Sequence, residues 1–401
     1  DDDSKLIVTI TPNEGIDFVN TYKADGSTTI EGTKTLTGRV LDENEFIFEI
    51  TGDGIAAAAP IQVTQKAAAE GGKIEYPKFA YHVDPDAEAG TAYDAATNTI
   101  NVTVAKVKDL KEAYSYKVTE LKPEKDPLGG ITYDKTEYKV SVQVTVNAED
   151  ASKLDAAAAI TKDGQAAAGA DFSNIYKARG SATIDGQKIY SKPLGDRKFS
   201  FEVKFGSNVL TTVMNDAKGD ISYPTFRYLV DPNTTETSVG VPVYDQASDS
   251  IIITVKNRAD IPEQIGYTIS EVIPEGAVDR GDGSYELDGV IYIAKTYTLT
   301  VSAKASGKAE EGASEYEKID VTPVLTDEAE KTAEATIFEN KYTAEGAAQI
   351  GAEKTLKGRN LKIDEFSFTL EDVTDFEAMG IEIEKDPNPL VTTVTNNAEG
   401  K

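Results

Sequence analysis

The stretch FVNTYKADGSTTIEGTKTLTGR, residues 18–39, recurs twice more along this 401-residue chain. The second copy reads FSNIYKARGSATIDGQKIYSKPLGDR (residues 172–197), and the third reads FENKYTAEGAAQIGAEKTLKGR (residues 338–359). In each copy a lysine lies 14 residues after an asparagine, and the pairs are Asn20 with Lys34, Asn174 with Lys188, and Asn340 with Lys354. Self-similarity of this kind indicates tandem copies of one folded unit.

A short aromatic segment follows each repeated lysine: EFIFEI (45–50), KFSFEV (198–203) and EFSFTL (365–370). Around these segments apolar and polar residues alternate with a period of two, Thr, Val, Tyr and Ile are frequent, and Gly, Pro, Asn and Asp mark the turns. This pattern is typical of antiparallel strands. We therefore predict an all-β chain of tandem immunoglobulin-like β-sandwich domains arranged as a rod-like array.

The spacing of the copies predicts two complete domains, residues 23–177 and 178–343. Residues 1–22 match only the final strands of a domain, and residues 344–401 match only the first half of one. We therefore expect the sequence to be a segment of a longer array of repeats. Alanine-rich runs such as 65–72 and 155–169 fall between the strand motifs, where we expect loops or short helices.

Composition excludes several classes of function. A formal charge of -28 would repel nucleic acid and anionic membrane. The absence of Cys excludes disulfides, thiolate metal sites and thiol nucleophiles, and the single histidine, His82, cannot form a zinc cluster and is expected to be structural. No run of about 18 apolar residues suggests insertion into a membrane. We expect no metal, no cofactor and no ordinary enzyme site.

Lysine, asparagine and glutamate recur on strand faces that are otherwise apolar, because residues two apart in a strand share a face. Lys34 shares its face with Ile30 and Leu36, and Asn174 lies between Phe172 and Tyr176. The same parity holds for Asn20, Lys188, Asn340 and Lys354, while Glu120 and Glu271 continue the faces of Tyr-rich strands. An inward lysine can protect an edge strand, and a strand-end Glu or Asn can cap a turn. Because lysine, asparagine and glutamate recur together on apolar faces, a reaction among the three side chains is favoured over these structural roles.

Burial would lower the pKa of the lysine and raise the pKa of the glutamate, which leaves a neutral amine and a neutral acid. The amine is then a nucleophile. A protonated glutamate bonded to the asparagine amide would polarise its carbonyl and relay a proton from the lysine to the leaving ammonia. The expected product is a neutral amide between lysine and asparagine.

The motifs TKTLTGR with EFIF, VTE after a Tyr-rich strand, and Phe-x-Asn-x-Tyr resemble the streptococcal pilin isopeptide linkage domain family, which has a collagen-adhesin B-type immunoglobulin-like fold. The resemblance implies a cross-link from Lys34 to Asn174 catalysed by Glu120, and another from Lys188 to Asn340 catalysed by Glu271. The second copy departs from the family pattern, and Lys192 there shares the parity of Lys188 without its 14-residue offset. Asn20 and Lys354 are expected to stay unpaired in the incomplete domains.

These observations predict a structural subunit or stalk of a Gram-positive surface fibre, either a pilus or a cell-wall-anchored protein. Its cross-links are expected to bear load, and its catalysis is expected to be limited to one self-modification per domain. Its expected partners are copies of the same fibre, and the resemblance adds sortase and host surface ligands. One alternative is a host-binding adhesin repeat region of a non-polymerised cell-wall protein. Another is a calcium-stabilised rod that uses Asp84, Asp86 and Asp1 to Asp3, although no spacing there matches a calcium loop.

Overall fold

The computed structural model describes residues 18–124, 129–347, 349–371 and 391–401. The described residues up to Tyr342 form one compact unit, and those from Thr343 onward form a second. Apart from short 3-10 turns, the regular elements in the described ranges are strands, in agreement with the all-β prediction. No helix in this part of the chain is long and apolar enough to cross a membrane.

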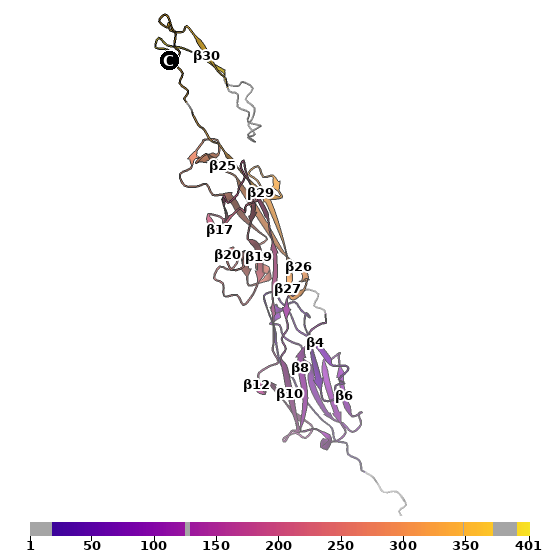
Figure 1. Ribbon diagram of the computed structural model, residues 1–401. Coiled ribbons are helices and arrows are strands. Elements are labelled where there is room, and N and C mark those ends of the chain that lie inside the picture. The colour runs from indigo at the N-terminus through magenta and orange to yellow at the C-terminus, as the bar shows by residue number, and fades with distance from the viewer. Residues whose placement is uncertain (1–17, 125–128, 348, 372–390) are drawn as a thin grey trace, which may run out of the picture. The chain divides into compact units, whose positions relative to one another are not determined.

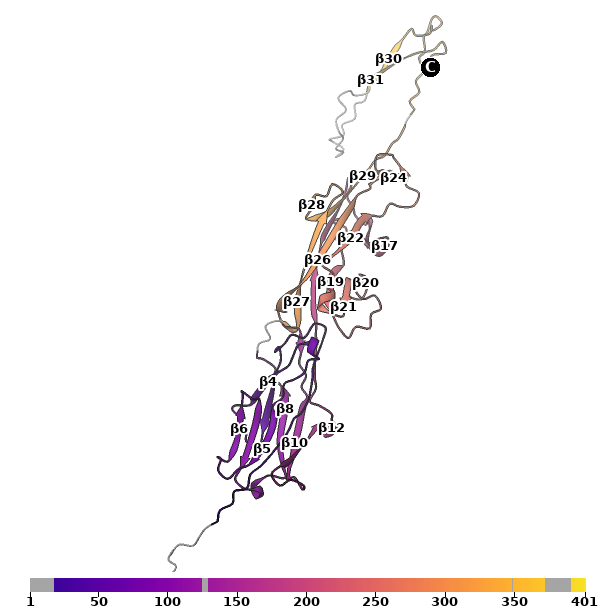
Figure 2. The same cartoon turned by 180° about the vertical axis from the view of Figure 1, so that it is seen from behind.

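The strands between residues 24 and 176 hydrogen-bond among themselves in three sheets, ordered β1-β5-β7-β6, β12-β11-β10-β8-β3-β4 and β2-β13-β9. Figure 2 shows β8 and β10 as neighbours, and β10 (Glu137–Val146) pairs antiparallel with β8 (Ala113–Glu120). The other elements are β1 (Ala24–Thr28), β2 (Lys34–Thr37), β3 (Ile47–Gly52), β4 (Ile61–Thr64), η1 (Ala68–Glu70), β5 (Lys78–Val83), β6 (Gly90–Asp94), β7 (Thr99–Val104), η2 (Val107–Asp109), β9 (Ile131–Thr132), β11 (Leu154–Lys162), β12 (Gln165–Ala167) and β13 (Phe172–Tyr176).

The strands between residues 178 and 342 form two further sheets, one ordered β17-β16-β22-β26-β27-β14-β19-β21-β20 with β28 on β27, and one ordered β18-β15-β29-β25-β24-β23. Figure 1 shows the long strands β26 (Thr296–Glu310) and β27 (Ala313–Thr326) side by side. The other elements are β14 (Ala178–Ala182), β15 (Asp185–Tyr190), β16 (Ser200–Phe205), β17 (Asn208–Met214), β18 (Asp220–Ser222), β19 (Thr225–Val230), β20 (Val243–Asp245), β21 (Ser250–Val255), η3 (Arg258–Asp260), β22 (Gln264–Glu271), β23 (Val278–Asp279), β24 (Ser284–Leu287), β25 (Val290–Ile293), β28 (Thr332–Ala333) and β29 (Ala335–Tyr342).

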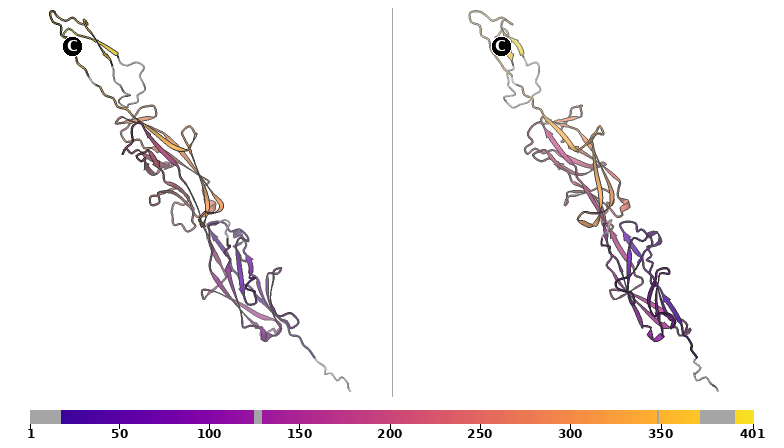
Figure 3. Two further views of the ribbon diagram at one scale, coloured as in Figure 1. Left: turned by 45° about the vertical axis from the view of Figure 1, so that its right-hand side comes forward. Right: turned by 90° about the vertical axis from the view of Figure 1, so that its right-hand side faces the viewer.

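These two groups of strands are called the first and second copy below, and both views of Figure 3 show them as separate groups of ribbons. In the second unit, β30 (Ser367–Glu371) pairs antiparallel with β31 (Val391–Thr395). The predicted boundaries of the two complete domains, residues 23–177 and 178–343, stay predictions.

The two copies have matching cores because their strands alternate inward and outward side chains. In the first copy the Phe48 ring of the aromatic segment lies 5.0 Å from the ring of Phe172 on the last strand. In the second copy the corresponding rings, Phe201 and Phe338, are 4.9 Å apart. All four side chains are buried. The aromatic segment therefore packs directly against the strand that carries the asparagine.

The last strand of each copy runs parallel to the lysine strand in the same register. Lys34 on β2 lies opposite Phe172 on β13, two residues before Asn174. Lys188 on β15 lies opposite Phe338 on β29, two residues before Asn340. Residues two apart share a face, so lysine and asparagine are diagonal neighbours on the inner face of one sheet.

One sequence-based expectation about the fold is wrong. The alanine-rich run 155–169 does not form loops or short helices but supplies most of β11 together with β12. β11 pairs with β10 continuously from Leu154 opposite Val146 to Lys162 opposite Tyr138. Its main-chain hydrogen bonds, rather than its small side chains, hold it in the sheet. The run 65–72 contains the short helix η1, as expected.

Candidate functional site

A buried glutamate bridges lysine and asparagine in the first copy. One carboxyl oxygen of Glu120, Oε2, accepts a hydrogen bond from Lys34 Nζ at 2.8 Å. The other, Oε1, accepts one from Asn174 Nδ2 at 2.7 Å. Glu120 ends β8 and pairs with Phe48, so it reaches the lysine and asparagine from the opposite sheet. The core between two sheets therefore contains a nucleophile, a proton acceptor and an amide in mutual contact.

The second copy repeats this arrangement with different neighbours. Lys188 Nζ donates to Glu271 Oε2 at 2.6 Å, and Asn340 Nδ2 donates to Glu271 Oε1 at 2.6 Å. Glu271 ends β22 and pairs with Phe201, as Glu120 pairs with Phe48. Six of the residues singled out from the sequence thus come together as two sets of three.

Both sets are sealed from water. The side chains of Lys34 and Glu120 are each 0% exposed, and those of Lys188 and Glu271 are 0% and 1% exposed. Burial lowers the pKa of Lys34 and lowers that of Lys188 to about 8, and it raises the pKa of both glutamates. The attraction within each pair acts in the opposite direction but does not overcome desolvation. Both partners are thus driven toward their neutral forms.

Aromatic rings line the lysine end of each site. Lys34 Nζ lies 4.7 Å from the ring centroid of Phe46, and Lys188 Nζ lies 4.4 Å from that of Phe199. These phenylalanines occupy the same position in the repeated aromatic segment. They exclude water from the amine, which explains why desolvation is the largest influence on the lysine pKa.

The asparagine carbonyl points away from the glutamate. Asn174 Oδ1 accepts the main-chain N–H of Asp134 at 2.7 Å, and Asn340 Oδ1 accepts that of Ile293 at 3.4 Å. The sequence predicts that glutamate polarises this carbonyl. In the structure glutamate instead contacts the amide nitrogen, the leaving group in the expected reaction, and a main-chain donor faces the oxygen.

The remaining sequence candidates lie outside the two sets. Lys192 Nζ lies 3.2 Å from the ring centroid of Tyr342, while Lys188 contacts the glutamate. Asn20 is exposed. Lys354 Nζ lies 4.5 Å from the Phe366 ring centroid, as the other two lysines lie near their phenylalanines, and among the described residues it has no hydrogen bond to a Glu or Asn side chain.

A buried amide that supports the aromatic segment was not anticipated from the sequence. The N–H of Phe46 donates to Gln65 Oε1 at 3.0 Å, and the N–H of Phe199 donates to Asn215 Oδ1 at 2.7 Å. In the second unit the N–H of Phe366 donates to Asn396 Oδ1 at 2.8 Å. The match of residues 211–220 with 392–401 placed Asn215 and Asn396 at equivalent positions, and that signal could have revealed them.

The residues proposed for calcium have other partners. Asp84 and Asp86 both bind the Lys23 ammonium, at 2.9 and 3.0 Å. Asp1 to Asp3 lie outside the described residues. His82 Nδ1 lies 2.6 Å from Asp25 Oδ1, within the surface of the first copy. These contacts give the charged groups structural roles.

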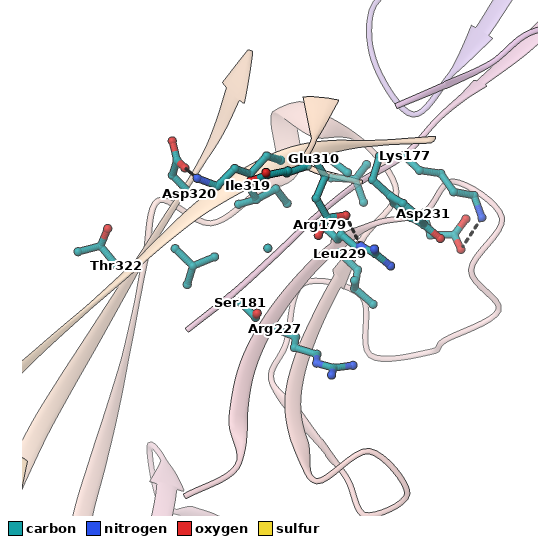
Figure 4. Close-up of a pocket in the computed structure, with 17 residues that line it drawn as sticks. Lys177, Arg179, Ser181, Arg227, Leu229, Asp231, Glu310, Ile319, Asp320 and Thr322 are labelled. Atoms are coloured by element: carbon teal, nitrogen blue, oxygen red, sulfur yellow. Dashed lines mark hydrogen bonds and ion pairs between the residues drawn. The ribbon is translucent and has the colours of Figure 1, made fainter. Parts of the chain in front are cut away.

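A cleft of about 1100 Å³ opens in the second copy where β14 and β27 diverge. Figure 4 shows that the charged groups at one side of it are paired, Arg179 with Glu310 and Lys177 with Asp231. A third pair, Lys318 with Asp320, lies on β27. Most of the charged groups that line the cleft are paired, and we assign it no function.

A further buried carboxylate lies where the first copy joins the second. Glu317 on β27 accepts hydrogen bonds from the Arg258 guanidinium, from the Tyr176 hydroxyl and from the main-chain N–H of Gly307. Tyr176 ends the last strand of the first copy, whereas the other three residues belong to the second. This cluster therefore connects the two copies within one compact unit.

A model of one protein family matches the first copy. Residues 30–112 and 106–177 match the FctA family, described as a Spy0128-like isopeptide containing domain. Among curated proteins, none matched.

The similar solved structures include the major pilin of Streptococcus pyogenes, with 16% identity, 81% of this chain and 99% of that chain covered, and a TM-score of 0.26. The T-13 major pilin of the same species has 14% identity, 81% and 100% coverage and a TM-score of 0.22. The pilus adhesin SpaC of Lactobacillus rhamnosus GG has 10% identity, 79% and 43% coverage and a TM-score of 0.17. The first copy, over residues 30–177, thus belongs to the family of Spy0128-like isopeptide-containing domains, and the second copy repeats its lysine, glutamate and asparagine.

Proposed function

We propose that the chain is a load-bearing segment of a pilus-like fibre on the surface of a Gram-positive bacterium, stabilised by two autocatalytic cross-links, Lys34–Asn174 and Lys188–Asn340. The observation that carries the proposal is the carboxyl bridge. In both copies one buried glutamate contacts the lysine nitrogen with one oxygen and the asparagine nitrogen with the other. A bridge of this kind has the geometry of a proton shuttle.

The reaction is balanced by these groups alone. The neutral Nζ of Lys34 attacks Cγ of Asn174, and the carbonyl π electrons move to Oδ1. A proton passes from Nζ to Glu120 Oε2, and the carboxyl delivers a proton from Oε1 to Nδ2. The electron pair on Oδ1 then re-forms the carbonyl as the Cγ–Nδ2 bond breaks, ammonia leaves, and an amide joins the two side chains. No external reactant is consumed, and each copy reacts once.

Burial supplies a reason for the reaction to be favourable. Ionised lysine and glutamate would each cost several kcal/mol in a water-free core, and the neutral forms leave polar groups with few partners. Conversion to an amide removes the amine altogether. The fold also holds the reactants in contact, which can contribute on the order of 7–11 kcal/mol toward the barrier when the alignment is good.

The positions of the cross-links define a load path. Tension that enters the first copy before Lys34 passes through the bond to Asn174 and bypasses residues 35–173. It then runs along β14 and β15 to Lys188, and through the second bond to Asn340, bypassing residues 189–339. A fibre built in this way resists extension because most of each copy never bears force.

The cross-links also limit unfolding. By the loop-closure relation used for disulfides, joining residues about 140 apart would stabilise a domain by roughly 5 kcal/mol. An extracellular chain without cysteine gains from such a bond what other secreted domains gain from disulfides. The partners that fit this role are copies of the same fibre, with sortase as the enzyme that would join them and anchor them to the wall.

Intact-mass measurement of the folded chain tests the proposal. The mass should fall short of the sequence mass by two ammonia molecules, and tryptic digestion should yield two branched peptides, one with Lys34 joined to Asn174 and one with Lys188 joined to Asn340. Asn20 and Lys354 should be recovered unmodified. A folded chain with its full unreacted mass would refute the proposal.

A further inference from the structure

The asparagine carbonyl oxygen is the atom on which charge develops during cross-linking. When the lysine attacks, Oδ1 becomes an oxyanion, and such a charge needs a donor about 2.7–3.1 Å away that is already in place. Glutamate cannot supply it here, because its two oxygens face the lysine and amide nitrogens. The donor must come from elsewhere.

In the first copy that donor is a main-chain N–H. Asp134 N lies 2.7 Å from Asn174 Oδ1, within the range that stabilises an oxyanion. Asp134 follows β9, which pairs with β13 through Thr132 opposite Ile175 and Ile131 opposite Tyr176. The chain leaves this ladder just after β9, and the N–H of Asp134 then faces the asparagine side chain instead of a main-chain carbonyl.

The Asp134 side chain fixes the local backbone. Its Oδ1 accepts the N–H of Thr136 at 2.9 Å, and its Oδ2 accepts the N–H of Ser173 at 2.8 Å. Ser173 directly precedes the reacting Asn174 in β13. One carboxylate thus holds its own loop through Thr136 and ties that loop to the reacting strand through Ser173.

We propose that the main-chain N–H of Asp134 stabilises the oxyanion formed on Asn174, and that the Asp134 carboxylate positions this N–H. The inference rests on the proposed cross-linking function and adds a catalytic donor to it. The N–H is a catalytic group because it touches a reacting atom. The carboxylate is a positioning group because it acts through the backbone.

The second copy has the same main-chain donor without the positioning carboxylate. Strand register aligns Ile131 with Val290, since they lie opposite Tyr176 and Tyr342, and this aligns Asp134 with Ile293. Isoleucine cannot accept hydrogen bonds from the loop or from the reacting strand. The N–H of Ile293 lies 3.4 Å from Asn340 Oδ1, and we attribute its longer distance to this difference.

Deletion of the single N–H tests the catalytic part. Replacing Asp134 with its α-hydroxy acid, L-malic acid, turns the Tyr133–Asp134 amide into an ester and keeps the side chain. The full-length chain is recovered unfolded and unreacted in urea and refolded by dilution. Timed acid quenching and digestion then give the yields of both branched peptides. In each of these samples, the rate of formation of the Lys188–Asn340 peptide serves as the internal reference.

We expect the ester to slow formation of Lys34–Asn174 by about 100-fold, the usual effect of losing one oxyanion donor, while Lys188–Asn340 forms at its normal rate. If the ester chain forms Lys34–Asn174 as fast as wild type, the donor assignment is wrong although the proposed function stands. If wild type loses no ammonia in either copy, the proposed function itself fails.

Side-chain variants test the positioning part. Asp134→Ala should slow the first bond by about tenfold through misplacement of the N–H, and Asp134→Asn should recover most of the rate because its carbonyl oxygen still accepts a hydrogen bond. Rates are compared at the pH where each chain forms the bond fastest, because loss of the Asp134 charge also changes the pKa of Lys34. At that pH, a wild-type rate for Asp134→Ala would overturn the positioning role.

Ile293→Asp provides the reverse test in a copy that keeps its own glutamate and asparagine. This change should accelerate Lys188–Asn340 several-fold relative to the unaltered Lys34–Asn174. An unchanged ratio of the two rates would also count against the positioning role.

Discussion

The two complete copies have similar contacts at the lysine and asparagine nitrogens of their sites. They differ in the contact made by the asparagine carbonyl oxygen. Glu120 and Glu271 contact lysine and asparagine with nearly the same distances, between 2.6 and 2.8 Å. The carbonyl oxygens have main-chain donors at 2.7 Å in the first copy and 3.4 Å in the second. The proposed proton shuttle therefore has the same geometry in both copies, whereas the proposed stabilisation of the developing charge depends on a loop that the repeat does not preserve.

Charge around the lysine also differs between the copies. Asp134 retains a lowered pKa although burial acts to raise it, because hydrogen bonds from Thr136 and Ser173 favour the carboxylate. Its charge lies near Lys34 and opposes loss of the lysine proton. Glu339 acts on Lys188 in the same direction, so in each copy a different carboxylate outside the glutamate bridge favours the protonated amine.

Removal of either glutamate should have the largest effect. Glu120→Ala should abolish Lys34–Asn174 and leave Lys188–Asn340 intact, and Glu271→Ala should do the reverse, because each carboxyl is the only shuttle placed at its site among the described residues. In single-molecule pulling, the altered copy should release roughly 450 Å of chain from residues 35–173, at about 3.3 Å per residue. Wild type should release none from this segment.

Glu120→Gln is the matched control because it keeps the size and polarity of the side chain but cannot shuttle a proton as a carboxyl does. It should also fail to cross-link. Formation of the branched peptide at normal yield in both variants would show that Glu120 is only a buried structural acid and that another group carries the proton.

The pH dependence should separate the two copies next. The pKa of Lys188 is lowered to about 8, so the reactive amine accumulates as pH rises toward 8. The amine is about half of the population at pH 8 and about one hundredth at pH 6, so Lys188–Asn340 should form about 50-fold more slowly at pH 6 than at pH 8. Burial raises the pKa of Glu271, but this acid still loses its proton at high pH. The rate of bond formation should therefore fall again at high pH.

Refolding of the unreacted chain across pH 6 to 9, with both branched peptides quantified in each sample, measures this profile. Asp134→Asn removes a charge that favours the protonated Lys34, and it should shift the profile of the first bond to lower pH without moving the second. A rate for Lys188–Asn340 that does not change between pH 6 and 8 would contradict the role of the neutral amine.

Sequence parity was sufficient to identify the buried lysine, glutamate and asparagine, because inward and outward positions alternate strictly within a strand. Parity could not identify the main-chain N–H of Asp134 as a donor to Asn174, because the direction of this N–H depends on the loop after β9. The alanine run 155–169 lacks apolar and polar alternation, so its strand was hidden. The cluster at Glu317 joins residues that are 59 and 141 positions apart, and no local pattern reports such contacts.

The Glu317 cluster should give a smaller effect that is confined to the second copy and its junction. Glu317→Gln removes the charge that Arg258 and Tyr176 bind and should lower the free energy of unfolding by about 1–3 kcal/mol, because Arg258 is partly exposed to solvent. Burial acts to raise the pKa of Glu317, but hydrogen bonds from Arg258, Tyr176 and Gly307 lower it overall. Its contribution is thus present above the unfolded pKa near 4.5 and is lost as pH falls below it.

Urea unfolding of wild type and Glu317→Gln at pH 7 and pH 3 measures this difference. By strand register, Ser152 occupies the position of Glu317 in the first copy, and Ser152→Ala serves as the control with little expected change. An equal loss of stability at both pH values would mean that packing, and not the carboxylate charge, stabilises the junction.

The smallest expected effect distinguishes two lysines with the same parity in the second copy. Lys192→Arg should leave the yield of Lys188–Asn340 unchanged, because Lys192 Nζ lies over the Tyr342 ring and away from Glu271. Lys188→Arg should abolish the bond, since the guanidinium remains protonated and is not a nucleophile. Peptide mapping of both variants decides between them. A branched peptide joining Lys192 to Asn340 in Lys188→Arg would show that the last strand can reach a second amine, and that contact with the glutamate does not select the nucleophile.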